Sequence, residues 1–92
     1  MAEELKIVDW LDGGENDDHW FSVKRLVVPG TKLCINYGKG NINNKTIHIR
    51  AILDDHYIVY RHWLKHKKRW NYVVEWDYWF FLLVKDGNID KA

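Results

Sequence analysis

The stretch that decides the fold runs from residue 45 to residue 76 and reads KTIHIRAILDDHYIVYRHWLKHKKRWNYVVEW. Apolar and polar residues alternate through Lys45–Leu53, His56–Leu64 and Arg69–Trp76, and β-branched and aromatic residues are frequent in all three. Alternation with a period of two is typical of strands that bury one face. Short polar segments at Asp54-Asp55 and Lys65–Arg69 separate them, so the pattern predicts two consecutive antiparallel hairpins.

The pairing of these strands follows from placing all their apolar sides on one face, because a slip of one residue would turn a strand's side chains over. A two-residue turn at Asp54-Asp55 then opposes Ile49 to Tyr60. A five-residue loop at 65–69 opposes Tyr60 to Val74. The predicted inner face consists of Ile47, Ile49, Ala51, Ile58, Tyr60, His62, Leu64, Trp70, Tyr72 and Val74.

The opposite face follows by alternation and mixes cationic with aromatic side chains. It is predicted to carry Thr46, His48, Arg50, Ile52, Tyr57, Val59, Arg61, Trp63, Asn71, Val73 and Glu75. The neighbouring hairpin tip, KHKKR at 65–69, adds four Lys and Arg residues and no acid. This face is the most informative feature of the sequence.

The segments before the hairpins are less regular. The spacing of Leu5, Val8 and Leu11 predicts a short helix over Glu3–Leu11 that ends at Gly13-Gly14, with a short strand as the alternative. The remaining predictions are a loop at 15–18, a strand at 20–28, a turn at Pro29-Gly30, a strand at 31–37 and a loop at 38–44.

After the hairpins, the run WDYWFFLLV at 76–84 is short enough to predict a buried strand, and 85–92 is predicted to be a frayed tail. Many short strands in a small chain favour a sheet that curls or closes and so protects its edges. The predicted class is mainly β (α+β at most), a small antiparallel curled sheet or barrel of SH3-like or OB-like type, with one short N-terminal helix.

Ninety-two residues are enough for a single domain and one core. Within 1–92 we distinguish an acidic N-terminal segment (1–18), an antiparallel β core (31–84) and a tail (85–92). Hydrophobic residues make up 47% of the chain, which argues against disorder, and the single Cys34 excludes an internal disulfide. No apolar run reaches about 18 residues and no signal peptide is evident, so we expect a cytoplasmic protein that does not enter a membrane.

Charge is distributed unevenly although the net charge is only +1. Residues 1–18 hold seven acids and one lysine, whereas the remainder holds thirteen Lys and Arg and six acids. Such asymmetry is typical of proteins that bind a charged partner. It also fits a plain role of the acidic end in solubility, and a third hypothesis is that this end folds over the basic surface and competes with a ligand.

A basic surface with aromatic rings suits single-stranded nucleic acid, because cations meet phosphates and bases stack on rings. The predicted binding residues are Arg50, Tyr57, Arg61, Trp63, Lys65, Lys67, Lys68 and Arg69. Two plainer interpretations remain open. The tip can be a solvated turn that discourages edge pairing, and Trp63 can belong to a second small core beneath residues 1–28.

A protein-binding module is the alternative function, since Tyr, Trp and Arg are frequent in interface hot spots. Its partner would be an acidic protein surface, a host protein or a nucleoprotein. The profile is similar in type to small phage-encoded inhibitors of host defence complexes, such as anti-CRISPR proteins, although no residue motif carries that comparison. If phage-encoded, the chain would act in the host cytoplasm.

An enzyme is the least favoured class, and we expect no cofactor and no metal. The carboxylates of Asp54 and Asp55 are explained by a turn. The five histidines do not combine with Cys34 into the spacing of a zinc site. His62 and His66 fall on a strand end and a loop, so their spacing does not bring them together as it would on a helix.

Overall fold

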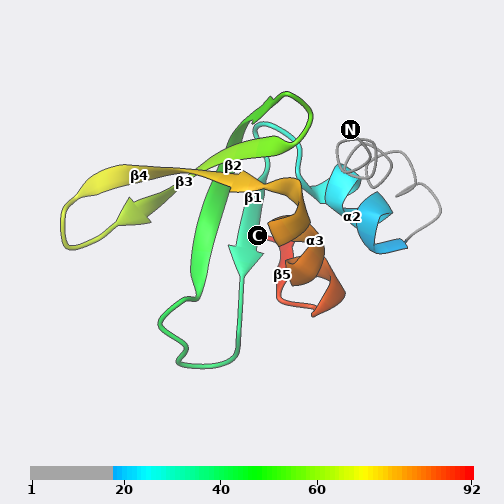
Figure 1. Ribbon diagram of the computed structural model, residues 1–92. Coiled ribbons are helices and arrows are strands. Elements are labelled where there is room, and N and C mark those ends of the chain that lie inside the picture. Colours follow the sequence, from blue (N-terminus) through cyan, green and yellow to red (C-terminus); the bar gives the residue numbers. More distant parts are fainter. Residues whose placement is uncertain (1–17) are drawn as a thin grey trace.

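The computed structural model describes residues 18–92 and consists of one five-stranded antiparallel sheet with two helices packed on it (Figure 1). The strands lie in the order β4-β3-β2-β1-β5. The elements are α2 (Asp18–Leu26), β1 (Lys32–Ile35), β2 (Lys45–Leu53), β3 (Tyr57–Leu64), β4 (Arg69–Trp76), α3 (Asp77–Lys85) and β5 (Ile89–Lys91). The helix predicted over Glu3–Leu11 lies outside the described residues.

The mainly β fold class is confirmed, in its curled and open form rather than as a barrel. The long hairpin of β3 and β4 extends to one side of the molecule, beyond the part of the sheet that the helices cover (Figure 1). The predicted strands at 45–53 and 69–76 coincide with β2 and β4, and the one at 56–64 differs from β3 by one residue. Alternation was therefore a sufficient signal for these strands.

The turn between β2 and β3 lies at Asp54-Asp55 as predicted, but Leu53 pairs with Tyr57 rather than with His56, so three residues instead of two join the strands. The His56 N–H donates to the Leu53 carbonyl oxygen at 3.1 Å. Asp54 and Asp55 both have left-handed φ angles, of 52° and 59°. Two consecutive positive φ angles are characteristic of a type I′ turn, whose twist matches that of the strands it joins.

The predicted pairing of Ile49 with Tyr60 is confirmed, but nearer the turn the pairing shifts by one residue. Ala51 rather than Arg50 lies opposite Val59, because an irregularity in β2 inserts Arg50 as an extra residue. Such a bulge leaves its extra residue without a partner in the ladder. The prediction that Arg50 alternates regularly onto the outer face is therefore wrong.

The second hairpin also differs from the prediction by one residue. Its loop has four residues, since Arg69 pairs directly with Leu64, and Tyr60 lies opposite Val73 rather than Val74. Lys68 closes the shorter loop with a left-handed φ of 50°. The slip turns β4 over, which moves every side chain of that strand to the face opposite the predicted one.

The segment predicted as a strand at 76–84 is a helix, α3. Phe80 and Leu83 are buried three residues apart, as one face of a helix requires. The uniform apolar run concealed that spacing. The helix ends where Gly87 adopts a φ of 71° and the Asn88 N–H donates to the Leu83 carbonyl oxygen at 2.8 Å, which is a glycine-terminated cap.

The strand predicted at 20–28 is likewise a helix, α2. Its buried residues Trp20 and Val23, with Val27 just beyond its end, recur at helical spacing. The Trp20 ring stacks on Phe81 of α3 with 4.6 Å between centroids, so the two helices pack together. Within residues 18–92, no helix is long and apolar enough to cross a membrane.

The predicted frayed tail at 85–92 contains β5, which pairs with β1. Ile89 is buried opposite Ile35, and the Asn36 N–H donates to the Asn88 carbonyl oxygen at 2.8 Å. A strand of three residues is too short to show alternation in a sequence. The end of the chain therefore completes the sheet and adds to the core.

The core lies between one face of the sheet and the two helices. It comprises Trp20, Val23, Val27, Leu33, Ile35, Ile47, Ile49, Ile58, Tyr60, Phe80, Leu83 and Ile89. Tyr60 stacks parallel to Trp79 at 5.9 Å, and burial raises the pKa of its phenol to about 12, so it stays neutral. Both helices cover this inner face, and no described helix covers the opposite one (Figure 1).

Candidate functional site

The face of the sheet opposite the core is called the outer face here. The cross-strand pairs place on it Lys32, Cys34, Thr46, His48, Ala51, Leu53, Tyr57, Val59, Arg61, Trp63, Trp70, Tyr72, Val74 and Trp76. Five of these side chains are Trp or Tyr. Asp90, opposite Cys34 on β5, is the one carboxylate that the described strands bring to this face.

The end of the outer face near the hairpin tip is organised around Arg61. Its guanidinium carbon lies 4.0 Å from the centre of the Trp70 ring, and its Nη1 donates to the Tyr72 hydroxyl at 3.0 Å. Trp63 and His48 meet Trp70 edge to face, at 5.3 and 5.0 Å between centroids. We call these five residues the arginine cluster.

Electrostatics make the arginine cluster a place that attracts anions. The Arg61 Nε is buried and has no hydrogen-bond partner within residues 18–92. The pKa of the neighbouring His48 imidazole is lowered, first by burial and then by the positive charges of Lys32, Arg61 and Arg50. A negative group placed here would meet several cations, and within residues 18–92 none of the described strands brings a carboxylate into the arginine cluster.

The cluster also leaves ring surface available for contact. Trp63 and Tyr72 are 47% and 58% exposed, whereas Trp70 between them is half-buried. Arg61 holds Trp70 and Tyr72 in place through the stack and the hydrogen bond. A planar ligand can therefore meet two exposed rings that are positioned before it binds, which lowers the entropy cost of binding.

The opposite end of the outer face, next to the Asp54-Asp55 turn, is apolar. Tyr57 packs on Trp76 with 4.8 Å between centroids. Leu53 and Val74 are 47% and 57% exposed beside them. Tyr57 to Trp63 spans about 20 Å along β3, so the outer face offers an elongated surface with a cationic end and an apolar end.

The predicted site residues are only partly brought together. Tyr57, Arg61 and Trp63 lie on the outer face as expected. Arg50 is exposed at the bulge, and its charge still reaches His48. The tip residues Lys65, Lys67, Lys68 and Arg69 are all exposed, the first three in the loop and the last at the start of β4.

Sequence reasoning missed the four aromatic and aliphatic residues of β4 that complete the outer face. Trp70, Tyr72 and Val74 were expected inside, and Trp76 was assigned to no face. The sequence did offer a signal for the correct pairing. A four-residue loop between β3 and β4, instead of the predicted five, places every Trp of this hairpin on one face. That loop length places Asn71 and Glu75 on the inner face, where Asn71 lies opposite the half-buried His62 and Glu75 lies opposite the buried Ile58.

The described part of the chain shows no group of side chains suited to binding a metal ion. No three His, Cys, Asp or Glu side chains among residues 18–92 are grouped to hold a metal ion. Cys34 is half-buried in β1. In comparisons with known proteins, no family model, curated protein or solved structure matches this chain. The side chains themselves therefore have to carry the functional argument.

Proposed function

We propose that this protein binds single-stranded nucleic acid, either free or within a nucleoprotein, and does so without catalysis, in the cytoplasm. Bases stack on the exposed rings of Trp63 and Tyr72, and phosphates meet Arg61 and the cations of the hairpin tip. The observation that carries this proposal is the arginine cluster, in which two exposed rings flank a guanidinium that is already stacked on Trp70.

Stacking favours this proposal because every base presents a flat π surface, and each base–ring stack contributes about 1–3 kcal/mol. Single-stranded RNA-binding sheets use the same physical principle, with aromatic side chains standing on an open face of the sheet. Here the face is open among the described elements, and its rings belong to neighbouring strands β3 and β4. Bases that follow one another in a strand could therefore meet successive rings.

The hairpin tip supplies the electrostatic part of binding. Lys65, Lys67, Lys68 and Arg69 are exposed and lie beside the arginine cluster, with no acid among them. Neutralising about four phosphates of a single strand gives a slope of log K against log salt of roughly −3. Replacing all four cations by Ala should remove most of that slope while the free energy of unfolding changes little.

The stacking step is tested by titrating tryptophan fluorescence with oligouridine and oligothymidine about 12 nucleotides long. Trp63→Ala and Tyr72→Ala should each weaken binding roughly tenfold or more, because each removes one stacking surface. Phe21→Ala is the matched control, since Phe21 is 49% exposed on α2, away from the outer face. Equal affinities for all three variants would refute the proposed interface.

A protein partner is the second candidate, favoured by the apolar end of the outer face. Leu53, Val74 and Trp76 are about half exposed there with no cation among them, and exposed apolar patches of this kind mark protein contacts. In this case Val74→Ala and Trp76→Ala would weaken capture of the partner, and oligonucleotides would not compete. An inhibitor of a nucleoprotein would use both ends of the face at once.

A further inference from the structure

The sheet forks between β2 and β3. Their ladder ends at the pair His48–Arg61, although β2 begins three residues earlier and β3 continues three residues further. On their other edges, residues 45–47 stay paired with β1 and residues 62–64 stay paired with β4. Each strand therefore has one edge without a β-ladder partner in this segment, and the β3–β4 hairpin turns away from β2 (Figure 1).

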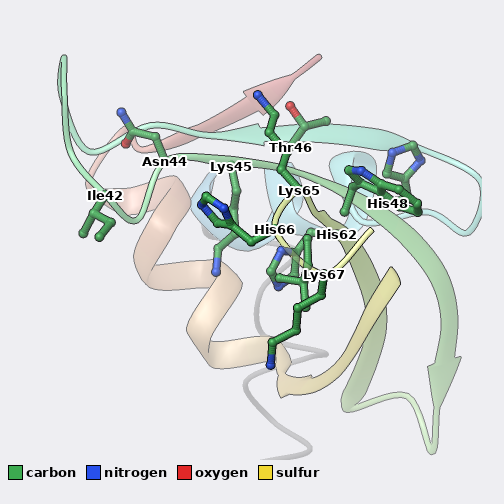
Figure 2. Close-up of a pocket in the computed structure, with 11 residues that line it drawn as sticks. Ile42, Asn44, Lys45, Thr46, His48, His62, Lys65, His66 and Lys67 are labelled. Carbon is green, nitrogen blue, oxygen red and sulfur yellow. The ribbon is translucent and has the colours of Figure 1, made fainter. Parts of the chain in front are cut away.

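The fork opens into a groove of about 720 Å³, between the 36–44 loop and the hairpin tip. Its ionisable lining residues are all basic: Lys45, Lys65, Lys67, His48, His62 and His66. Figure 2 shows Lys45, His62, His66 and Lys67 gathered in the middle of the groove, with Asn44 towards one end and His48 towards the other. We call this site the fork groove.

Hydrogen bonds hold the loop side of the fork groove in shape. The Asn44 side chain accepts from the Tyr37 N–H at 2.7 Å and donates to the Gly38 carbonyl oxygen at 2.6 Å. The Gly38 N–H in turn donates to the Asn36 side-chain oxygen at 2.9 Å. The wall is thus built by the protein's own contacts, and a ligand need not order it on binding.

The groove concentrates basic side chains, and none of the described residues that line it is an acid. Burial lowers the pKa of the His62 imidazole, and the Lys45 ammonium lowers it further. On the β4 side, the Asn71 side-chain nitrogen lies 3.0 Å from His62 Nε2 and can donate to it while the ring is neutral. His48, at the other end, has a lowered pKa through burial and the cations of β1 and β3. A bound anion would favour the protonated form of both rings.

We propose that the fork groove binds a phosphate group, either the terminal phosphate of a nucleic acid strand or part of a free oligophosphate. Ammonium groups and imidazoles are suitable donors for phosphate oxygens, and charge-assisted hydrogen bonds of this kind are about twice as strong as neutral ones. His48 and Trp63 belong to both the groove and the arginine cluster, so a strand stacked on the outer face can extend its end into the groove.

The groove's own affinity is tested on the full chain with inorganic tripolyphosphate, followed by NMR. Signals of Lys45, His62 and Lys67 should shift most, and bound tripolyphosphate should raise the pKa values of the His48 and His62 rings. Lys67→Gln should weaken binding about tenfold. Lys68→Gln is the matched control, because Lys68 lies on the same tip but does not line the groove.

Equal losses for Lys67→Gln and Lys68→Gln, or shifts spread evenly over all exposed lysines, would overturn the proposal and leave only diffuse attraction. Tighter binding of an oligoglutamate peptide than of tripolyphosphate would also overturn it, because the groove would then suit an extended acidic peptide. The hydrogen-bonded loop wall and the three histidines that line the groove instead predict a preference for phosphate.

The source of the phosphate is distinguished with one oligonucleotide sequence prepared with a 5′-phosphate, a 3′-phosphate or no terminal phosphate. If the protein prefers a phosphorylated end and Lys67→Gln abolishes that preference, the groove binds the end of a strand. If the protein binds tripolyphosphate but shows no such preference, the groove binds free oligophosphates. Tripolyphosphate binding together with unaltered oligonucleotide affinity in Trp63→Ala and Tyr72→Ala would refute the proposed function alone. Absence of tripolyphosphate binding, together with weakened oligonucleotide binding in both variants, would refute the fork groove alone.

Discussion

The two faces of the sheet both carry large aromatic side chains but place them in different surroundings. On the inner face, Tyr60 is 3% exposed and packs against both Trp79 and the fully buried Phe80. On the outer face, Tyr72 belongs to the adjacent strand and is 58% exposed, with a hydrogen bond to Arg61. The same residue type is used for packing on one face and is available for contact on the other.

The difference indicates what each face contributes. Burial against two helices stabilises the fold, since apolar area removed from water contributes about 25 cal/mol per Å². A ring that stays half exposed contributes little of that free energy. The stability of the described residues therefore does not explain why Trp63, Tyr72 and Trp76 are exposed on one surface, whereas the proposed binding of a ligand would explain it.

The comparison is tested most strongly by removing one ring from each face. Phe80→Ala should lower the free energy of unfolding by about 3–5 kcal/mol, because the ring is fully buried and its loss leaves a cavity. Tyr72→Ala should lower it by less than about 1 kcal/mol. Urea denaturation followed by circular dichroism measures both losses.

Nucleic acid affinity should show the opposite order among folded variants: Tyr72→Ala should weaken binding, and a change at Phe80 should not. Phe80→Leu, which keeps most of the apolar volume, serves as a folded core variant and should retain the affinity of the original chain. Similar unfolding losses for Phe80→Ala and Tyr72→Ala would mean that the outer face is packed like the inner one, which would break the distinction between them.

The strands and the outward positions of Arg61 and Trp63 could be predicted because alternation reflects a sheet with one buried face. The helices could not, since nothing in the uniform run at 76–84 separates period 3.6 from period two before Gly87 marks the helix end. Which side chains of β4 face outward depended on whether the loop before it has four or five residues. Lys68 adopts a left-handed φ without the Gly or Asn that would have indicated it.

The fork groove lay beyond sequence reasoning for a different reason. All its lining residues lie within positions 42–67, but its two walls form a groove only because the β2–β3 ladder stops at His48–Arg61. Alternation continues on both strands past that point and predicts continued pairing of Ile47 with His62. The end of a ladder depends on how the sheet twists, here between a hairpin that stays paired with β4 and a strand that stays paired with β1, and alternation carries no record of it.

A smaller effect comes from the turn that both faces share. Asp55→Gly should raise the free energy of unfolding by roughly 0.5–1 kcal/mol, because glycine adopts the positive φ of this turn position without a steric cost. Both Asp54 and Asp55 are exposed, so neither face is altered. Thermal unfolding measures the gain, and oligonucleotide affinity should be unchanged.

Asp55→Ala is the opposite control for the turn. Alanine has neither the freedom of glycine nor the tolerance of aspartate for left-handed backbone, so this variant should be less stable than the original chain. If affinity rises together with stability in Asp55→Gly, the exposed rings depend on the rigidity of the hairpin, and the two faces are less independent than the comparison states.

The smallest expected effect concerns the one buried carboxylate of the described residues, at the start of α3. Asp77 is 6% exposed, with Oδ2 3.7 Å from His56 Nδ1. Burial raises the pKa of its carboxyl above the ordinary 3.8, against the opposing effects of the Tyr78 backbone N–H and of His56. Because the folded pKa is the higher one, this carboxyl stabilises the fold most below pH 3.8, and that contribution is lost as pH rises through the folded pKa.

Asp77→Asn removes this titration while it keeps the size of the side chain. The difference in melting temperature between the original chain and Asp77→Asn should therefore favour the original chain most near pH 3.5 and should shrink or reverse by pH 7. A His56→Gln background removes one of the opposing effects, so the change with pH should become larger there. A difference that instead grows in favour of the original chain as pH rises would show that the helix N-terminus and His56 stabilise the charged form more than burial destabilises it. The covered face would then tolerate a charge as readily as the outer face does.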